Sequence, residues 1–447
     1  MRKELPYRQI HLDFHTSPLI GNVGKQFNAE EFADTLKKAH VNSINLFAKC
    51  HHGMYYYPTK LGKMHPGLNF DLFGEEIKVC RENNMRVVAY TCVVWNEDYA
   101  DRHPECLAID FEGRSGAKEP FCNAYYTWQS LCLNNAAYQE DLKREFREIY
   151  DNYHPDGFWI DIVEGRHCIC QTCKKEMINE GLVPSDINDV RYHDKMIEIN
   201  FCKKMFNYIK ALDEDLEVYF NSTPYGLDDA TDIKISTTEK RKYFSFIDVE
   251  SLPGDQWGYT HFPIAADYMD KYNLNLTMMN GKFHMSWGDF GTLRNQNALE
   301  YECFRAVAHG ARVCIGDQLH PSGMLDEAVY KRIGNVFGSI ECKEPWLVNT
   351  KKVCDVGVVI PKSPMDTDPK AGDIVTQGVY LVLSELHIPF DFVNYEDEVD
   401  SYKLIILPDE VILTDEMTKK INSYMENGGK VLATGKSGYD FNNNRML

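Results

Sequence analysis

The chain has 447 residues, of which 44% are hydrophobic and 26% charged, and its formal net charge is −19. This length predicts two or three domains of a soluble globular protein. The negative charge disfavours nucleic acids and anionic membrane surfaces as partners and favours neutral substrates.

The terminus and the cysteines predict a cytoplasmic protein. Residues 1–6 contain no apolar signal segment, and no stretch reaches the roughly 20 apolar residues of a membrane-spanning helix. The 14 cysteines are scattered, several of them inside apolar segments such as those around Cys202 and Cys314. This distribution is typical of reduced thiols and not of a disulfide framework.

Short apolar strands alternate with amphipathic helices over residues 9–342. The strands are continuous apolar runs, as expected of a parallel sheet buried on both faces. Eight of them predict a (β/α)8 TIM barrel, and the alternative is an unusually wide doubly wound sheet. We expect strands at 9–14, 43–49, 86–94, 157–162, 216–221, 244–250, 275–281 and 312–317, and helices at 29–40, 71–83, 136–152, 191–212, 295–308 and 326–342.

A second αβ series begins near Val353 and predicts a flavodoxin-like (glutamine-amidotransferase-like) doubly wound α/β domain. We therefore expect a catalytic barrel over residues 1–348 and a second domain over 349–447, the latter incomplete because it stops after a handful of elements. The expected strands are 353–360, 390–393, 404–409 and 429–435, and the expected helices are 377–386 and 414–427.

The tripeptide Trp159-Ile160-Asp161 ends a buried apolar strand. A carboxylate is costly in a dry interior, so a strand that ends in Asp directs it to a pocket or a cation. Trp159 lies on the same side of the strand because side chains repeat with period two. A carboxylate beside an aromatic wall suits a sugar-cleaving site. The alternative is an Asp that caps a strand-to-loop turn.

Other chemically active side chains follow several strands. The carboxyl ends of barrel strands meet at one mouth, where functional residues of this fold lie. We therefore predict a catalytic or binding pocket there. Its candidates are His15, His51, His52, Trp159, Asp161, Glu250, His284, Trp287, Asp289, Asp317 and His320.

Asp161 and Glu250 are the predicted catalytic pair. Glycoside hydrolysis needs one carboxyl to attack and one to deliver a proton, about 5–5.5 Å apart in a retaining enzyme. The ends of the fourth and sixth strands can face each other across a barrel mouth. Glu250 could instead be a salt-bridged loop residue, with Asp289 or Asp317 as the acid.

His51 and His52 leave their strand in different directions and can contact neighbouring sugar hydroxyls. A neutral imidazole offers one donor and one acceptor, which matches a hydroxyl group. One of the two could instead pack the loop. Metal binding is less expected here, since no nearby residue completes a ligand set.

Cys168, Cys170 and Cys173 have the tight spacing of a structural zinc site. Such a site normally takes four ligands, and Cys132 is the predicted fourth, with Cys122 and Cys106 as further candidates. The alternative is a loop with three free thiols.

Several motifs resemble those of retaining α-L-fucosidases. The segment 48–53, the pair Phe14-His15 and the motif 159–161 resemble family 29 enzymes. The segments 250–259, 283–291 and 316–323 are closer to family 151 enzymes. The layout of a barrel with a second domain is similar to family 42 β-galactosidases, in which that domain mediates trimer formation. Those enzymes can carry a zinc-binding cysteine cluster, which Cys132, Cys168, Cys170 and Cys173 resemble.

The resemblance implies a double displacement on a fucosylated or galactosylated oligosaccharide. Asp161 would attack the anomeric carbon, and Glu250 would act as acid and then base. The substrate-binding residues would be His15, His51, His52, Trp159, Trp257, His284, Trp287 and Asp317. We expect no catalytic cofactor, a structural zinc ion, and a homo-oligomer, either a trimer or a dimer. The alternatives are a β-galactosidase-like glycosidase and a non-catalytic sugar-binding protein.

Overall fold

The structure is a computed structural model of the 447-residue chain. It describes residues 4–118, 125–221, 238–254, 257–269, 274–361, 369–395, 397–440 and 445–446. Within this part of the chain, no helix is long and apolar enough to cross a membrane.

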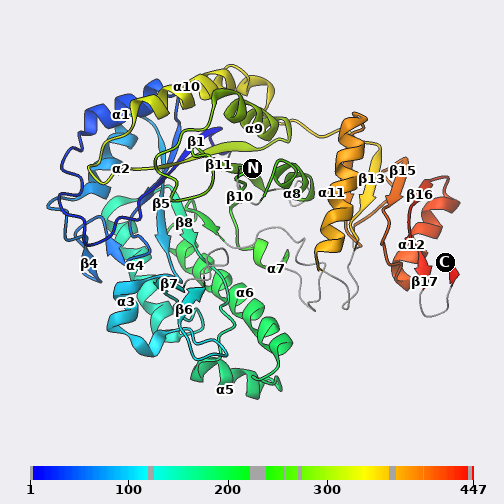
Figure 1. Cartoon of the computed structure of the whole chain (residues 1–447), viewed down its shortest axis with the longest axis horizontal. Coiled ribbons are helices and arrows are strands. Elements are labelled where there is room, and N and C mark those ends of the chain that lie inside the picture. The colour runs from blue at the N-terminus through cyan, green and yellow to red at the C-terminus, as the bar shows by residue number, and fades with distance from the viewer. Residues whose placement is uncertain are drawn as a thin grey trace.

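Eight parallel strands form a nearly closed barrel, so the predicted TIM-barrel fold is confirmed (Figure 1). The strands are hydrogen-bonded in the order β10-β11-β12-β1-β2-β5-β8-β9. The remaining edges meet where the Ser245 amide donates to the Val218 carbonyl at 2.8 Å. The strands are β1 (Arg8–Asp13), β2 (Ser43–Phe47), β5 (Arg86–Cys92), β8 (Gly157–Asp161), β9 (Glu217–Phe220), β10 (Phe246–Glu250), β11 (Asn275–Gly281) and β12 (Arg312–Gln318).

The six predicted barrel helices are present. Most begin behind an Asn or Asp whose side chain accepts from the first turn, as Asn28 and Asp71 do. They are α1 (Ala29–Lys38), α2 (Leu72–Glu82), α4 (Ala136–Tyr153), α6 (Ile187–Leu212), α9 (Gln296–Ala308) and α10 (Glu327–Glu341). Short helices that the sequence patterns did not indicate are α3 (Glu97–Arg102), α5 (Gln171–Asn179), α7 (Thr238–Arg241) and α8 (His261–Met269).

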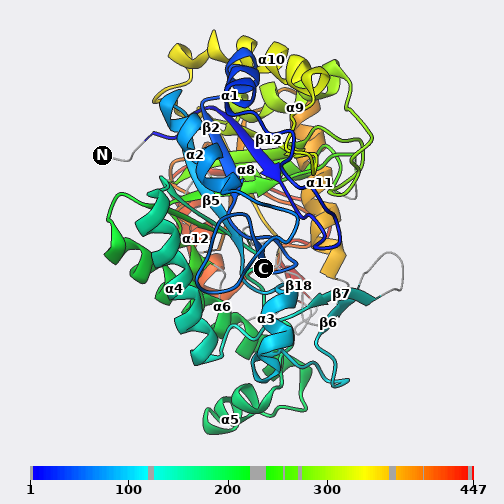
Figure 2. The ribbon, with the colours of Figure 1, turned by 90° about the vertical axis from the view of Figure 1, so that its left-hand side faces the viewer.

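Long excursions follow the strands β2, β5 and β8. They contain the paired strands β3 (Met54–Tyr55) and β4 (Lys63–Met64), the hairpin of β6 (Gly116–Lys118) and β7 (Tyr125–Gln129), and helices α3 and α5. In both views the hairpin, α3 and α5 project from one end of the barrel (Figures 1 and 2). The excursions therefore build up one side of the barrel mouth.

The second sheet is parallel and has the order β14-β13-β15-β16. This is the start of the flavodoxin-like order, as predicted. Its helix α11 begins eight residues before the predicted start. The elements are β13 (Val356–Val359), α11 (Pro369–Glu385), β14 (Phe390–Val393), β15 (Leu404–Leu407), α12 (Asp415–Glu426) and β16 (Lys430–Ala433), followed by the paired β17 (Tyr439–Asp440) and β18 (Arg445–Met446).

The strands β13, β14 and β15 of this sheet are largely buried, whereas the edge strand β16 is mostly exposed. On one face Val358, Phe390 and Ile406 join the apolar core of the barrel. On the other face Val359, Ile405 and Leu407 pack with residues of α12 in a separate core. Figure 1 shows α11 on the side of the sheet nearer the barrel and α12 on the far side.

Candidate active site

Aromatic rings fill the barrel beneath its mouth. The ring of His11 lies 5.5 Å from Tyr90, 4.8 Å from Trp159 and 5.5 Å from Trp287, measured between centroids. Trp159 and Asp161 lie on the same side of β8, as their spacing predicts, and both are buried. The rings therefore form a dry floor below the carboxylate.

Asp161 is held at the end of β8 by three side-chain donors. Tyr90 OH lies 2.5 Å and His51 Nε2 3.1 Å from Oδ2, and Asn221 Nδ2 lies 2.9 Å from Oδ1. Burial alone raises the pKa of this carboxyl, but the hydrogen bond and charge of His51, with the bonds from Tyr90 and Asn221, outweigh it and lower the pKa. Asp161 is therefore ionised at neutral pH, as a nucleophile must be.

The backbone turns sharply behind Asp161. Ile162 has a φ of 52°, a left-handed conformation that a β-branched residue rarely adopts. Such a conformation costs on the order of 1–3 kcal/mol and persists only when its surroundings hold it. Here the Val163 amide donates to Asn221 O and the Asn221 amide to Ile160 O, which clamps the turn against the neighbouring strand.

His15 supports His51 and has no free ring nitrogen. Its ring stacks on His51 with centroids 3.6 Å apart, and its Nδ1 accepts from the His51 backbone amide at 3.2 Å. A neutral imidazole then carries its proton on Nε2, which lies 3.1 Å from Asp13 Oδ1. Burial and the neighbouring His51 hold the pKa of His15 well below its usual value. The predicted contact of His15 with a sugar hydroxyl is thus not supported, since both nitrogens are committed.

His52 is the histidine that remains available. Its ring lies 4.4 Å from that of Trp128, which also lies 5.4 Å from His51. Burial, followed by the neighbouring His51, lowers the pKa of His52 to about 4. The ring is therefore neutral at physiological pH and offers both a donor and an acceptor to a hydroxyl group.

Glu250 lies at the end of β10 beside Trp287. The indole Nε1 of Trp287 donates to Glu250 Oε1 at 2.5 Å. Burial raises the pKa of this carboxyl to about 7, the negative charge of Asp161 adds to the effect, and the Trp287 hydrogen bond opposes it. The two carboxyls of the mouth thus have pKa values pushed in opposite directions, as acid and nucleophile require.

Trp287 reaches Glu250 only because of a glycine. A Cβ on Gly316 of β12 would collide with the Trp287 ring. The absence of a side chain at this position lets the indole lie against the strand, with its N–H toward Glu250.

Trp159, Trp257 and His284 occupy different places in the mouth. Trp159 belongs to the floor: it stacks near Tyr90, and its Nε1 donates to Asp248 Oδ2 at 3.2 Å. Trp257 packs near the His261 ring, with centroids 5.9 Å apart. His284 is exposed on the loop after β11. Trp159 therefore lies in the floor of the pocket and supports it, instead of forming the predicted wall beside the sugar ring.

The two alternative acids do not face the nucleophile. Asp317 pairs in register with Leu12, and its carboxyl lies near the phenol of Tyr330 in α10, on the outer side of the barrel. The predicted substrate contact of Asp317 is wrong because alternation along β12 turns its side chain outward. Asp289 Oδ2 accepts from Thr292 at 2.5 Å and from the Met285 amide at 3.2 Å, as a turn-capping residue does. His320 likewise forms a local turn, with its Nδ1 2.8 Å from Ser322 Oγ.

Sequence reasoning missed Tyr90, Asn221 and Trp128. Tyr90 lies within a predicted strand, but its phenol could not be assigned to Asp161 without the barrel geometry. Asn221 follows the strand next to β8, and its amide lies close enough to Glu250 to lower the pKa of that carboxyl. A single residue therefore acts on both candidate catalytic carboxyls, which lie close together. Trp128 lies at the end of a hairpin that no clear sequence pattern indicates.

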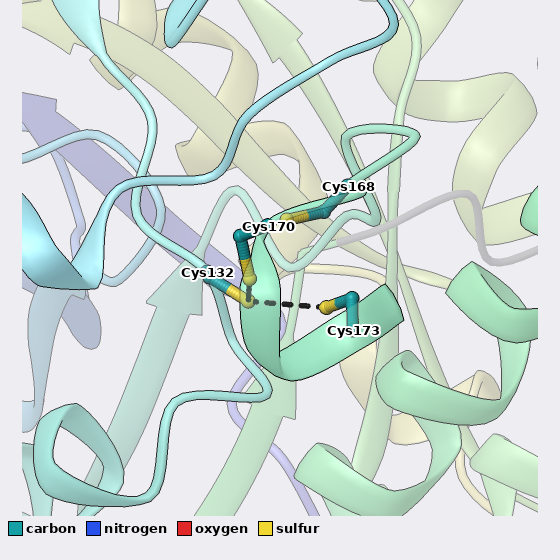
Figure 3. Close-up of side chains that lie close together, drawn as sticks. All are labelled: Cys132, Cys168, Cys170 and Cys173. Atoms are coloured by element: carbon teal, nitrogen blue, oxygen red, sulfur yellow. Dashed lines mark hydrogen bonds between the residues drawn. The ribbon is translucent and has the colours of Figure 1, made fainter. Parts of the chain in front are cut away.

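The four cysteines predicted to form a metal site lie together (Figure 3). Their sulfur atoms are all within 4.8 Å of one another, and Cys132 Sγ lies 3.6 Å from Cys173 and 3.8 Å from Cys170. A tetrahedral zinc ion with Zn–S bonds of about 2.3 Å requires sulfurs about 3.8 Å apart. Cys168 and Cys170 lie on the loop that follows Asp161, Cys173 lies in the first turn of α5, and Cys132 precedes α4. The residues therefore fit a structural zinc ion.

His15, His51 and Asp161 also bring three ligand atoms within 4.8 Å of one another. These atoms already hydrogen-bond within the site: His51 Nε2 with Asp161, and both nitrogens of His15 with its neighbours. We therefore assign this group to the substrate pocket and not to a metal.

Comparison with known proteins supports the resemblance that the motifs indicated. The solved α-L-fucosidase isoenzyme 2 from Paenibacillus thiaminolyticus is 35% identical, with a TM-score of 0.89, and the match covers 98% of this chain. The chain is a relative of an α-L-fucosidase. It spans 65% of the length of that protein.

The other matches agree with the two-part layout. A family model described as hypothetical glycosyl hydrolase 6 matches residues 28–162, and one described as a β-galactosidase trimerisation domain matches residues 371–447. A β-galactosidase of Lactobacillus acidophilus is 22% identical over 90% of this chain and 69% of its own length. The β-galactosidase of Marinomonas ef1 shares the fold, with a TM-score of 0.68 and 13% identity over 98% of this chain and 77% of its own.

Proposed function

We propose that the protein is a retaining exo-glycosidase that hydrolyses terminal α-L-fucose. The observation that carries this proposal is the pair Asp161 and Glu250, whose environments lower the pKa of the first carboxyl and raise the second to about 7. The choice of sugar rests on the 35% identity with the Paenibacillus α-L-fucosidase.

Asp161 is assigned as the nucleophile. Its Oδ2 hydrogen-bonds with Tyr90 and His51, whereas Oδ1 accepts one hydrogen bond, from Asn221. Oδ1 therefore keeps a lone pair for attack on the anomeric carbon. The new ester bond forms as the bond to the leaving oxygen breaks.

Glu250 is assigned as the acid and base. Trp287 occupies Oε1, so Oε2 is the oxygen that carries the proton. In the first step this proton passes to the leaving oxygen, and in the second the carboxylate takes a proton from water that hydrolyses the ester. His52 and Trp128 are assigned to the sugar hydroxyls and ring, and Trp287 to the wall beside the acid.

The test is hydrolysis of nitrophenyl α-L-fucoside, β-galactoside and α-galactoside by the wild type and the Asp161→Asn variant. We expect activity on the α-L-fucoside that falls by about 10³-fold or more in the variant. The matched control, Asp289→Asn, removes a carboxylate bound only within its own turn and should change the rate by less than about tenfold. Equal rates in wild type and Asp161→Asn would overturn the assignment.

A β-galactosidase-like activity is the second candidate. It is favoured by the 22% identity with the Lactobacillus β-galactosidase over 90% of the chain. Preference for the β-galactoside in the same panel would select it. Binding of sugar without hydrolysis of any substrate would instead indicate a sugar-binding protein.

We also propose that Cys132, Cys168, Cys170 and Cys173 hold a structural zinc ion. The four thiols lie on three separate segments, and zinc would tie the loop after Asp161 to α5 and to the segment before α4. Metal analysis of protein purified without chelator should return about one zinc per chain. A metal-free preparation that remains folded would contradict the proposal.

Self-association is proposed as well, as a trimer or a dimer. It is supported by the match of residues 371–447 to a β-galactosidase trimerisation domain and by exposed apolar residues along α11, including Ile374, Leu381 and Val382. Light scattering coupled to size-exclusion chromatography would measure the oligomeric state. A monomer at micromolar concentration would contradict the proposed self-association.

A further inference from the structure

A cavity of about 580 Å³ lies beside the barrel mouth, and His52 forms part of its lining. One wall comes from the segment after β1, a second from the segment of β3 and β4 after β2, and a third from α3 after β5. These segments all follow carboxyl ends of barrel strands, so the cavity is on the same side of the barrel as Asp161. Its volume is within the range of small-molecule sites.

His52 connects this cavity to the nucleophile. The preceding residue, His51, hydrogen-bonds with Asp161 through Nε2 at 3.1 Å. The first two amides of α3 donate to the carbonyls of His51 and His52, at 3.3 and 3.2 Å, which fixes the helix to this loop. Because aromatic rings fill the barrel below Asp161, the rest of an oligosaccharide must extend along the mouth, where this cavity adjoins the nucleophile.

One wall of the cavity is apolar. It is formed by Pro18, Met54, Met64 and Pro66. Met64 and Pro66 are partly or fully exposed, so their side chains can contact a ligand. Methionine is a flexible and polarisable side chain that adapts to an irregular apolar surface such as the C–H face of a sugar ring.

The opposite wall carries an excess of negative charge. Its three carboxylates face a single cationic side chain of the lining, Lys63. Asp98 is neutralised, since Lys63 Nζ lies 2.7 Å from Oδ1 and Arg102 Nε 2.8 Å from Oδ2. Glu97 Oε1 accepts from the last amide of β7 at 2.5 Å, and Asp101 is exposed at the rim. Glu97 Oε2 and the carboxylate of Asp101 can therefore accept hydrogen bonds from a ligand.

We propose that this cavity is the subsite for the leaving group of the substrate and that it takes an uncharged sugar ring. This inference rests on the proposed function. The apolar face of the ring lies against Met64 and Pro66, and its hydroxyl groups donate to Glu97 and Asp101. Carboxylates accept from hydroxyl groups but repel an anion at short range, so a leaving group that carries sulfate or carboxylate is disfavoured.

The test compares two kinds of fucoside on the same preparation. In α-L-fucosyl fluoride the leaving group is a single atom, which leaves the cavity empty. The second substrate is the best of four disaccharides for the wild type, with fucose linked 1→2 to galactose or 1→3, 1→4 or 1→6 to N-acetylglucosamine. In Glu97→Gln/Asp101→Asn the ratio of kcat/KM for the disaccharide to that for the fluoride should fall by about tenfold or more. Loss of folded protein cancels in this ratio.

The matched control is Glu105→Gln. Glu105 follows α3, its side chain is 67% exposed, and it does not line the cavity. Its replacement removes one carboxylate from the same region and should leave the ratio at the wild-type value.

A sulfated form of the same disaccharide, with the sulfate on the second sugar, tests the charge of the subsite. The wild type should hydrolyse it about tenfold more slowly than the uncharged form, and the double variant should lose most of this discrimination. An unchanged ratio in the double variant, with the fluoride hydrolysed normally by the wild type, would overturn the subsite alone. A wild type that does not hydrolyse the fluoride would overturn the proposed function and the subsite with it.

Discussion

The phenol of Tyr90 donates to Oδ2 of Asp161 at 2.5 Å, from the strand beside the one that carries the carboxylate. The same oxygen lies 3.1 Å from His51 Nε2. Two neighbouring strands and the loop after β2 thus converge on one atom. This convergence leaves the other oxygen of Asp161 for the substrate.

Replacing Tyr90 by Phe should weaken the nucleophile. A hydrogen bond to a charged group contributes about 1.5–3 kcal/mol, which corresponds to a rate loss of about 10- to 100-fold. Because the Tyr90 bond lowers the pKa of Asp161, its removal raises that pKa, and the acidic limb of the kcat/KM profile should move to higher pH. The control is Tyr138→Phe, whose buried hydroxyl donates to the Val93 carbonyl away from the site. An unmoved acidic limb in Tyr90→Phe would contradict this assignment.

The alkaline limb should report Glu250. An acid must be protonated to act, so activity is present below its pKa and falls as pH rises through about 7. In Glu250→Gln this limb should disappear, and the remaining rate should depend strongly on leaving-group acidity, because good leaving groups need no protonation. The measurement is kcat/KM against pH for a poor and a good leaving group. A wild-type alkaline limb that persists in Glu250→Gln would assign the acid elsewhere.

Trp287→Phe tests the partner of that acid. The indole hydrogen bond lowers the pKa of Glu250 against the effect of burial, so its loss should raise the pKa and move the alkaline limb upward. A merely structural role for Trp287 would lower the rate without moving the limb. Trp346→Phe, an exposed tryptophan remote from the barrel mouth, is a suitable control.

Cys173→Ser should destabilise the protein if the four thiols hold zinc. A loss of about 2 kcal/mol would lower the unfolding temperature by roughly 5 °C in a domain of this size. Chelator should lower the unfolding temperature of the wild type and have no further effect on the variant. Cys202→Ser alters a buried cysteine of α6 outside the cluster and controls for the loss of a core thiol. Equal responses to chelator in wild type and Cys173→Ser would argue against a metal.

Much of the fold could be predicted because its signals are local. Continuous apolar runs identified all eight barrel strands, and Asn or Asp caps mark the long helices. The short helix α8 was missed because it is buried nearly all round, with Phe262, Ile264 and Tyr268 all inside the core. A helix without a polar face has no amphipathic period to detect.

The sequence by itself determined the strands, the position of Asp161 at a strand end, and the close spacing of three cysteines. Tertiary structure decided which side chains meet there. Tyr90 reaches Asp161 because β5 pairs with β8, and Cys132 reaches Cys173 across 41 positions of the chain. Tertiary structure also decided that Asp317 faces α10. Side chains alternate between the two faces of a strand, and only the closed barrel determines which face points inward. Local patterns follow from backbone geometry, whereas a site depends on contacts between distant segments, which only packing sets.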